Sequence, residues 1–391
     1  MSRLRPSISP MLAVSGGYYL LFIAMGLSMS SLGPTLPALA QSTGTGVEQI
    51  SSVFVTRAIG NMLGSLLGGR IFDRMRGNPV LGGMMLGVGG LMVITPLAPN
   101  IWMLNILMFL TGILHGIINV GGNTLLIWVH GSKVGPYMSA LHLFFGLGSL
   151  LCPMIIAQMV LVTTNTMIYW VLAALAIPMA LPMFFLPSPP HEAKARGEPA
   201  ATTNLLLVGI FAGILFCYAG ASFSFTGWIY TYTLTRNLAD AVGAAYLTSL
   251  YWGSFTIGRL ASIPLTIRMR PRAILLADYL LGLASVLLML IWQDSLLAAS
   301  LGSLGIGLAV ASIYPTVFTL AQRTMHVTGR ISSWFAIGNA LGGVIVPWIV
   351  GQYFERTGPQ VLLFALLIIF IAALAFVSTL QPALRRIGHA Q

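Results

Sequence analysis

The sequence predicts an all-α integral membrane protein with twelve transmembrane helices in two six-helix bundles. Charged residues make up 7% of the chain and hydrophobic residues 57%, whereas soluble domains carry about 25% charged residues. A soluble domain must cover its surface with polar side chains, so most of this surface must face lipid. Apolar runs of about 20 residues, the length that crosses a bilayer, recur from one end of the chain to the other.

The apolar runs form two sets of six, separated by a polar stretch rich in proline and charge. The runs lie at roughly 12–38, 50–72, 79–98, 101–128, 136–160, 167–186, 204–233, 242–267, 273–292, 295–322, 331–353 and 360–380. The polar stretch has the composition of a linker. We therefore expect an N-terminal bundle over 1–186, a cytoplasmic linker over 187–203 and a C-terminal bundle over 204–391.

The ends of these runs predict an orientation. The first run reaches past residue 30 without a small-residue cleavage site, so we interpret it as a span rather than a removed signal. One side of the membrane receives most of the cations, and the other receives Arg236 and Arg356. By the positive-inside rule both termini are cytoplasmic. This asymmetry accounts for the net charge of +11 without a nucleic-acid partner, in a multi-pass protein of the inner or plasma membrane.

The fifth and eleventh spans repeat each other. Four residues of the fifth recur 194 positions later, and the pairs are Ser139 with Ser333, Gly148 with Gly342, Pro153 with Pro347 and Gln158 with Gln352. This register predicts two halves related by an axis along the membrane normal. Cys152 and Cys217 both fall inside spans, so we expect small buried hydrophobes and no disulfide, metal site or redox pair.

A short segment rich in charged residues follows the second span. Gly60, Gly64 and Gly68 recur at every fourth residue and predict a smooth helix face. The segment 68–77 then reads Gly-Gly-Arg-Ile-Phe-Asp-Arg-Met-Arg-Gly. It resembles the signature loop of the major facilitator superfamily, although Met75 departs from the usual pattern. The resemblance implies a transporter that catalyses no reaction, with gating residues Gly69, Asp73, Arg74 and Arg76. The alternative is ordinary cytoplasmic charge beside a lone carboxylate.

The fourth span carries a polar stripe. His115, Asn119 and Asn123 share one helical face with Gly112, Gly116 and Gly122. Polar groups on this face should avoid lipid, so the stripe faces either neighbouring helices or a water-filled cavity. Neutral amides offer both donor and acceptor, which suits a hydroxyl-rich, uncharged solute. Because the fourth helix lines the pathway in the superfamily, we favour His115, Asn119 and Asn123 as solute contacts.

Further candidate contacts lie in other spans. His142 in the fifth span and Asn339 in the eleventh are membrane polar residues, with interhelical hydrogen bonding as the alternative. Sugar faces stack on aromatic rings, although interfacial and core packing explain many such rings. The aromatic candidates are Tyr218, Trp228, Tyr251 and Trp252.

Charged residues inside spans are costly and usually functional. Arg57 lies within one turn of Asn61 on the second span, and both are candidate substrate or gate ligands, with snorkelling to the interface as the alternative for Arg57. Arg259 in the eighth span and Asp278 in the ninth are expected to form a structural charge pair.

A narrower resemblance spans both halves. Residues 251–260 read Tyr-Trp-Gly-Ser-Phe-Thr-Ile-Gly-Arg-Leu, and the second and seventh spans carry Phe54, Arg57, Gly60 and Tyr218-x-Gly220. These residues look like the sodium-dependent glucose transporter group, related to the fucose permease branch. The resemblance implies a sugar or sugar-like substrate, bound at the midplane and moved by rocker-switch alternating access. Relatives in this branch tend to carry Glu where this chain has Ser222, another candidate contact.

The sequence therefore predicts a monomeric secondary transporter with no cofactor and no metal. Coupling to H⁺ or Na⁺ is doubtful because the spans hold almost no carboxylates, which a coupling cation would neutralise. An organic-anion carrier using Arg57 and Arg259 is one alternative. A non-transporting membrane receptor or scaffold is another.

Overall fold

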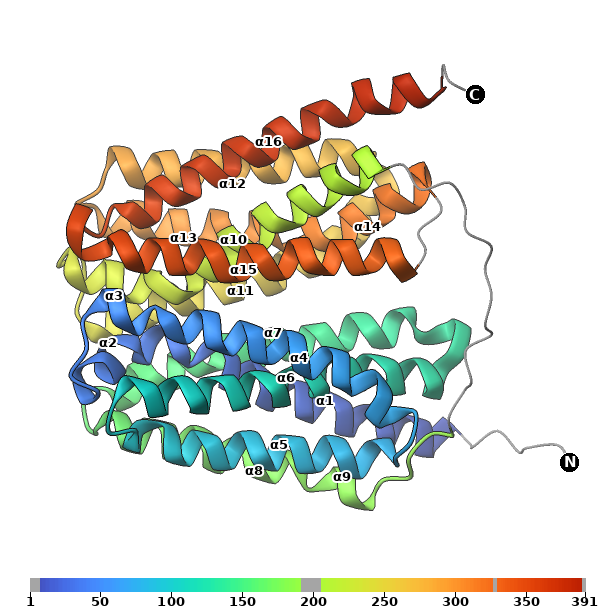
Figure 1. Ribbon diagram of the computed structural model, residues 1–391, viewed down its shortest axis with the longest axis horizontal. Helices are drawn as coiled ribbons and strands as arrows, with labels where there is room; N and C mark the ends of the chain where they lie inside the picture. The colour runs from blue at the N-terminus through green and yellow to red at the C-terminus, as the bar shows by residue number, and fades with distance from the viewer. Residues whose placement is uncertain (1–7, 191–204, 326–328, 389–391) are drawn as a thin grey trace, which may run out of the picture. The chain divides into compact units, whose positions relative to one another are not determined.

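The computed structural model describes residues 8–190, 205–325 and 329–388, and in these ranges the chain forms helices and turns without strands (Figure 1). Contacts between residues divide the chain into two compact units. Unit 1 holds Met1–Gly46 and Ser52–Lys194, and unit 2 holds Val47–Ser51 and Ala195–Gln391. The division at 187–203 that the sequence suggests falls mostly outside the described residues.

Unit 1 is built from eight α-helices and two short 3₁₀ turns. They are α1 (Ile8–Ser30), α2 (Leu32–Ser42), α4 (Ser52–Phe72), α5 (Gly77–Ile94), η1 (Thr95–Leu97), α6 (Ile101–His130), η2 (Gly131–Lys133), α7 (Val134–Met159), α8 (Asn165–Ala180) and α9 (Pro182–Phe185).

Unit 2 contains the second set of long helices and one short helix from the first half of the sequence. They are α3 (Val47–Ile50), α10 (Leu205–Thr235), α11 (Ala241–Arg268), α12 (Pro271–Ile291), α13 (Leu296–Ala311), α14 (Ile313–Thr324), α15 (Gly329–Thr357) and α16 (Val361–Gly388). The five residues Val47–Ser51 belong to this unit although α2 and α4, on either side of them in the chain, belong to unit 1.

Each predicted span coincides with a helical stretch, but some spans are interrupted, among them the sixth, which breaks at Leu181 between α8 and α9. The first breaks at Ser31 between α1 and α2, and the tenth breaks at Ser312 between α13 and α14. Both new helices have proline as their third residue, Pro34 in α2 and Pro315 in α14. Proline lacks an amide hydrogen, and the first turn is where a helix loses nothing by that.

Eleven helical stretches within the described residues are long and apolar enough to cross a membrane. The remaining long helix, α11, has 28 residues and would reach across a bilayer, but it is less apolar and carries Arg259 and Arg268. The all-α membrane architecture is therefore confirmed, while the count of twelve spans stays a prediction.

Glycines allow the closest helix contacts in each unit. A Cβ atom added at Gly64 of α4 would lie 2.0 Å from the Ile113 carbonyl oxygen of α6, so these helices pack backbone against backbone. This confirms the smooth face predicted for the second span. The repeated pair behaves alike in both units, because a Cβ at Gly148 would lie 2.1 Å from the Ile23 carbonyl oxygen and one at Gly342 would lie 2.0 Å from that of Phe216.

Candidate functional site

The polar stripe of α6 carries two amides that bind each other. Asn123 Nδ2 donates to the Asn119 backbone oxygen at 2.7 Å and to Asn119 Oδ1 at 3.2 Å. Both side chains are half-buried, so part of each amide stays accessible. The structure thus brings these two predicted contacts together on one face, one helical turn apart.

His115 lies one turn before Asn119 on the same helix and differs from it in exposure. Its side chain is fully buried, and neither ring nitrogen has a hydrogen-bond partner among the described residues. A buried imidazole without partners is costly, which marks this position as more than ordinary packing. His115 therefore differs from the two amides in being closed off from solvent in this structure.

Arg57 points from α4 toward α1. Its Nη2 donates to the Met29 backbone oxygen at 3.2 Å. The guanidinium lines a cavity of about 10 Å³ whose wall also includes Ser28, Thr111 and Tyr169. Tyr169 lies 2.9 Å from the Thr35 hydroxyl, which itself donates to the Ser31 backbone oxygen at 2.8 Å.

The other candidates of unit 1 sit apart from this cavity. The His142 ring meets Phe22 edge to face, with ring centroids 6.3 Å apart and planes at 80°. Asn61 is half-buried, and its backbone lies against Gly112 and Gly116 of α6. A larger hollow of about 420 Å³, lined by apolar side chains of α1, α7 and α9, contains none of the predicted solute contacts.

In unit 2, Ser222 of α10 and Tyr251 of α11 form a hydrogen bond, with their hydroxyl oxygens 2.7 Å apart. Both side chains are buried, and the Tyr251 ring lies within 5.4 Å of the Trp252 ring and 5.3 Å of the Phe225 ring, measured between centroids. The Ser222 hydroxyl is therefore paired with a neutral group, the Tyr251 phenol.

Trp228 is a packing residue in this structure. Its side chain is fully buried, its Nε1 donates to the Pro347 backbone oxygen at 2.9 Å, and its ring stacks on Phe354 with centroids 5.2 Å apart. A solute could not reach this ring without displacing the core. We therefore leave Trp228 out of the proposed solute contacts.

Three candidates of unit 2 remain half-buried, namely Tyr218, Trp252 and Asn339. The Tyr218 ring lies 5.9 Å from that of Tyr314, centroid to centroid. Asn339 Oδ1 is buried and has no hydrogen-bond partner within the described ranges. An amide oxygen without a partner is a group that a hydroxyl-bearing ligand would satisfy.

The expected charge pair between Arg259 and Asp278 is wrong. The guanidinium carbon of Arg259 lies 4.6 Å from the centroid of the Phe255 ring, a cation–π contact on its own helix. The Asp278 carboxylate instead accepts a hydrogen bond from Ser312, the residue at the break between α13 and α14. The two residues do not pair because each has a nearer partner, the Phe255 ring for Arg259 and the Ser312 hydroxyl for Asp278.

The loop after α4 leaves its charges in the open. Asp73, Arg74 and Arg76 are all exposed and make no ion pair with any residue that the structure describes. Gly69 has open space around it, since a Cβ added there would meet nothing within 4 Å. The gating role of these four residues stays a prediction.

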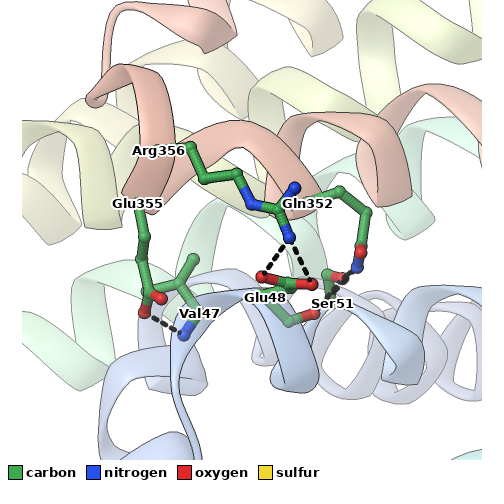
Figure 2. Close-up of polar contacts among 6 residues, drawn as sticks. All are labelled: Val47, Glu48, Ser51, Gln352, Glu355 and Arg356. Atoms are coloured by element: carbon green, nitrogen blue, oxygen red, sulfur yellow. Dashed lines mark hydrogen bonds and ion pairs between the residues drawn. The ribbon is translucent and has the colours of Figure 1, made fainter.

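The sequence analysis did not predict a cluster of hydrogen bonds and one ion pair between α3 and α15 (Figure 2). Arg356 Nη2 lies 3.2 Å from both carboxylate oxygens of Glu48. The Val47 amide donates to Glu355 Oε1 at 2.7 Å, and Gln352 Nε2 donates at 3.0 Å to the Glu48 backbone oxygen and to Ser51 Oγ. We call these six residues the α3 clasp. Glu48, Glu355 and Arg356 stand out as charges on the side that is otherwise poor in them.

With the fold and these contacts in place, comparison with known proteins identifies the family. The family model described as Major Facilitator Superfamily matches residues 18–347, well over half of the chain. The chain belongs to the Major Facilitator Superfamily. It is a multi-pass membrane protein of a transporter family rather than an enzyme, which confirms the resemblance and the fold class predicted from the sequence.

Similar proteins include the sodium-dependent glucose transporters 1. The Danio rerio protein is 28% identical over 94% of this chain and 68% of its own length, and the Homo sapiens protein is 25% identical over 84% and 71%. Among solved structures, the nucleoside transporter NupG has a TM-score of 0.76 at 14% identity, covering 95% of this chain and 98% of its own. A D-xylose-proton symporter has a TM-score of 0.73 at 13% identity, covering 93% and 97%. These structures share the fold.

Proposed function

We propose that this superfamily member is a secondary transporter that moves a sugar or sugar-like solute by alternating access. The observation that carries the proposal is the Asn119–Asn123 pair, whose half-buried amides offer donor and acceptor without net charge. Such groups suit hydroxyls and leave an ionic solute without a counter-charge. The names of the sodium-dependent glucose transporters 1 point to the same substrate class.

The solute contacts are proposed as one set in each unit. In unit 1 they are Asn119 and Asn123, with Asn61 and His142 as further members. In unit 2 they are Trp252, Tyr218 and Asn339, which are half-buried and offer ring faces and an amide. The predicted contacts His115, Ser222 and Tyr251 are buried, and of these Tyr251 packs its ring against that of Trp252.

The membrane spans offer few carboxylates through which transport could be coupled to an ion. Among the described residues, Asp278 is the one carboxylate in the interior of a span, since Glu48 and Glu355 lie near the ends of theirs, and it belongs to unit 2. A coupling cation needs a charge that it can neutralise. We therefore propose that facilitated transport is the default and that any coupling to H⁺ or Na⁺ acts through Asp278.

The remaining features of the proposal follow the charge pattern. Both termini are placed in the cytoplasm of a cell with the protein in its inner or plasma membrane, because the cations gather on that side. The protein acts as a monomer without a nucleic-acid partner. The exposed loop charges Asp73 and Arg74 and the contacts of the α3 clasp are the proposed conformational contacts.

The experiment is uptake by purified protein in liposomes. Solutes that bind are first found by thermal shift among sugars, polyols and small acids, and uptake of the best one is then measured for wild type and N119A/N123A. Losing both amides should raise KM at least tenfold, since each hydrogen bond to a neutral group is worth about 1 kcal/mol. The control S300A removes a hydroxyl that is bonded within its own helix. Normal uptake by N119A/N123A would overturn the site.

The alternative, an organic-anion carrier, draws on one observation, the Arg57 guanidinium beside a polar cavity. Competition separates the two functions. A neutral sugar that competes while small organic acids do not supports the sugar assignment, and the reverse result supports the anion carrier. Absence of any flux from a folded, solute-binding protein would favour a receptor or scaffold.

A further inference from the structure

A small, partly open cavity inside unit 1 borders the half-buried Arg57 side chain. Four helices supply polar residues to its wall, with Ser28 from α1, Arg57 from α4, Thr111 from α6 and Tyr169 from α8, and the rest of the wall includes the apolar Leu32, Met92 and Met108. Its volume of about 10 Å³ has room for about one water-sized species. The cavity is thus too small for a sugar and large enough for a single small ion.

The groups that line this cavity offer hydrogen-bond donors. Ser28 is 5% exposed and Thr111 is 6% exposed, and neither hydroxyl has a partner within the part of the chain that the structure describes. Arg57 uses one donor on the Met29 carbonyl, whereas a guanidinium carries several. The Tyr169 hydroxyl is not free in the same way. Because the Thr35 hydroxyl donates its hydrogen to the Ser31 carbonyl, it accepts the hydrogen bond that the Tyr169 phenol donates.

The same region lacks negative charge. Asp73 is the one carboxylate among the described residues of unit 1, and it follows Arg57 by sixteen positions. At 1.5 Å per helical residue this separation is about 24 Å, too far for an ion pair. A cation within a span is costly until it is paired. The cavity therefore combines an uncompensated cation with free hydroxyl donors and no acceptor of opposite charge.

We propose that Arg57, Ser28 and Thr111 bind a small inorganic anion of the size of chloride. The anion neutralises the guanidinium and accepts hydrogen bonds from both hydroxyls, and so joins α1, α4 and α6. A water molecule would fill the same space but would leave the positive charge uncompensated. This site is independent of the proposed solute, because none of its three ligands belongs to the amide pair.

The test is the thermal unfolding of the purified full-length protein without any sugar. The protein is exchanged into gluconate at constant ionic strength and then titrated with chloride, bromide or acetate. Chloride and bromide should raise the midpoint saturably, by about 2 °C or more at saturation. R57Q should not respond, and S28A/T111V should need at least tenfold more chloride. R236Q and S300A, which change a half-buried arginine paired with Asp294 and a hydroxyl bonded within its own helix, both in unit 2, should respond to chloride as wild type does.

Three results would overturn the proposal. The first is a wild-type midpoint that does not depend on halide, and the second is an R57Q variant that responds as wild type does. The third is a response to acetate without one to chloride, which would assign the cavity to an organic acid group. If R57Q does not fold, S28A/T111V decides the matter, because it keeps the charge and removes the two free hydroxyls. A failure of sugar transport would leave these results unchanged.

Discussion

Glu48 of α3 and Arg356 of α15 form an ion pair in which one guanidinium nitrogen lies 3.2 Å from each carboxylate oxygen. The Arg356 side chain is 65% exposed and that of Glu48 is 39% exposed, so water screens their attraction. Such pairs contribute about 1 kcal/mol or less. A contact this weak could open and close readily if the proposed alternating access requires α3 to leave α15.

Breaking this ion pair should release α3 without unfolding unit 2. Ser51 is fully buried, so its replacement by cysteine gives a probe that reacts only when α3 leaves α15. In a C152A/C217A background, S51C should react with a membrane-impermeant thiol reagent at least threefold faster when R356E is added. The charge swap E48R/R356E should restore slow labelling. Equal labelling rates in all three proteins would refute the clasp.

Gly351 tests the same contact through its shape. A Cβ added there would lie 2.1 Å from Ser51 Cβ, so α3 can approach α15 only at a glycine. G351V should therefore speed labelling of S51C at least as much as R356E does. High salt should speed labelling where the Glu48–Arg356 ion pair is intact, because it screens that pair, and should not slow the labelling caused by G351V. The matched control is G209A, whose added Cβ meets nothing within 4 Å.

Asp278 should distinguish coupled from facilitated transport. If an ion gradient drives uptake through this carboxylate, D278N should abolish accumulation against a gradient but keep solute counterflow, which needs no net ion movement. S312A, which removes the hydrogen bond to the carboxylate, should give a partial defect. Wild-type accumulation by D278N at several pH values and sodium concentrations would exclude Asp278 from coupling.

Two tryptophans should respond differently to the same change. W228F removes the hydrogen bond to the Pro347 carbonyl from a fully buried ring, so it should lower stability by about 1–3 kcal/mol and leave KM unchanged. W252F alters a half-buried ring and should raise KM with a small change in stability. Thermal unfolding measures the change in stability, and uptake kinetics measure the change in KM. If W228F raised KM and W252F lowered stability instead, Trp228 would be the solute contact and Trp252 the packing residue.

Close packing of α4 on α6 predicts a large effect at Gly64. An added Cβ would lie 2.0 Å from the Ile113 carbonyl oxygen, and backbone cannot move aside as a side chain can. G64A should destabilise the protein by about 1–3 kcal/mol or more. G90A, where the added Cβ meets nothing within 4 Å, should be neutral or slightly stabilising. Equal unfolding midpoints for the two variants would contradict this packing.

Much of the fold could be predicted because lipid imposes a simple pattern on the chain. Each span is a run of apolar residues of fixed length, and glycines such as Gly64 and Gly148 mark close helix contacts. Even the repeat between the fifth and eleventh spans reappeared as equal backbone contacts in both units. Breaks at Ser31 and Ser312 were missed, because a proline in a first turn leaves no gap in hydropathy.

Side-chain partners could be predicted less well, because spacing along a helix says which residues share a face but not what that face meets. Asn119 and Asn123 share a face as predicted because both lie on one helix, while their contact with a solute stays a prediction. We paired Arg259 with Asp278 as the sole acid in a predicted span, yet in the structure Arg259 lies over the Phe255 ring and Asp278 accepts a hydrogen bond from Ser312. Glu48 was overlooked because its partners lie some 300 residues away in sequence.

The α3 clasp also governs how the chain could be divided. Five residues that complete unit 2 reside between two helices of unit 1, so a cut in the linker would not separate two self-sufficient pieces. A C-terminal fragment made alone would lack the groups that bind Gln352, Glu355 and Arg356. If the two halves are co-expressed, Val47–Ser51 of the first half must bind to the second half as they assemble. A fragment that begins after the linker should therefore form the native contacts of Gln352, Glu355 and Arg356 only when the first half is present.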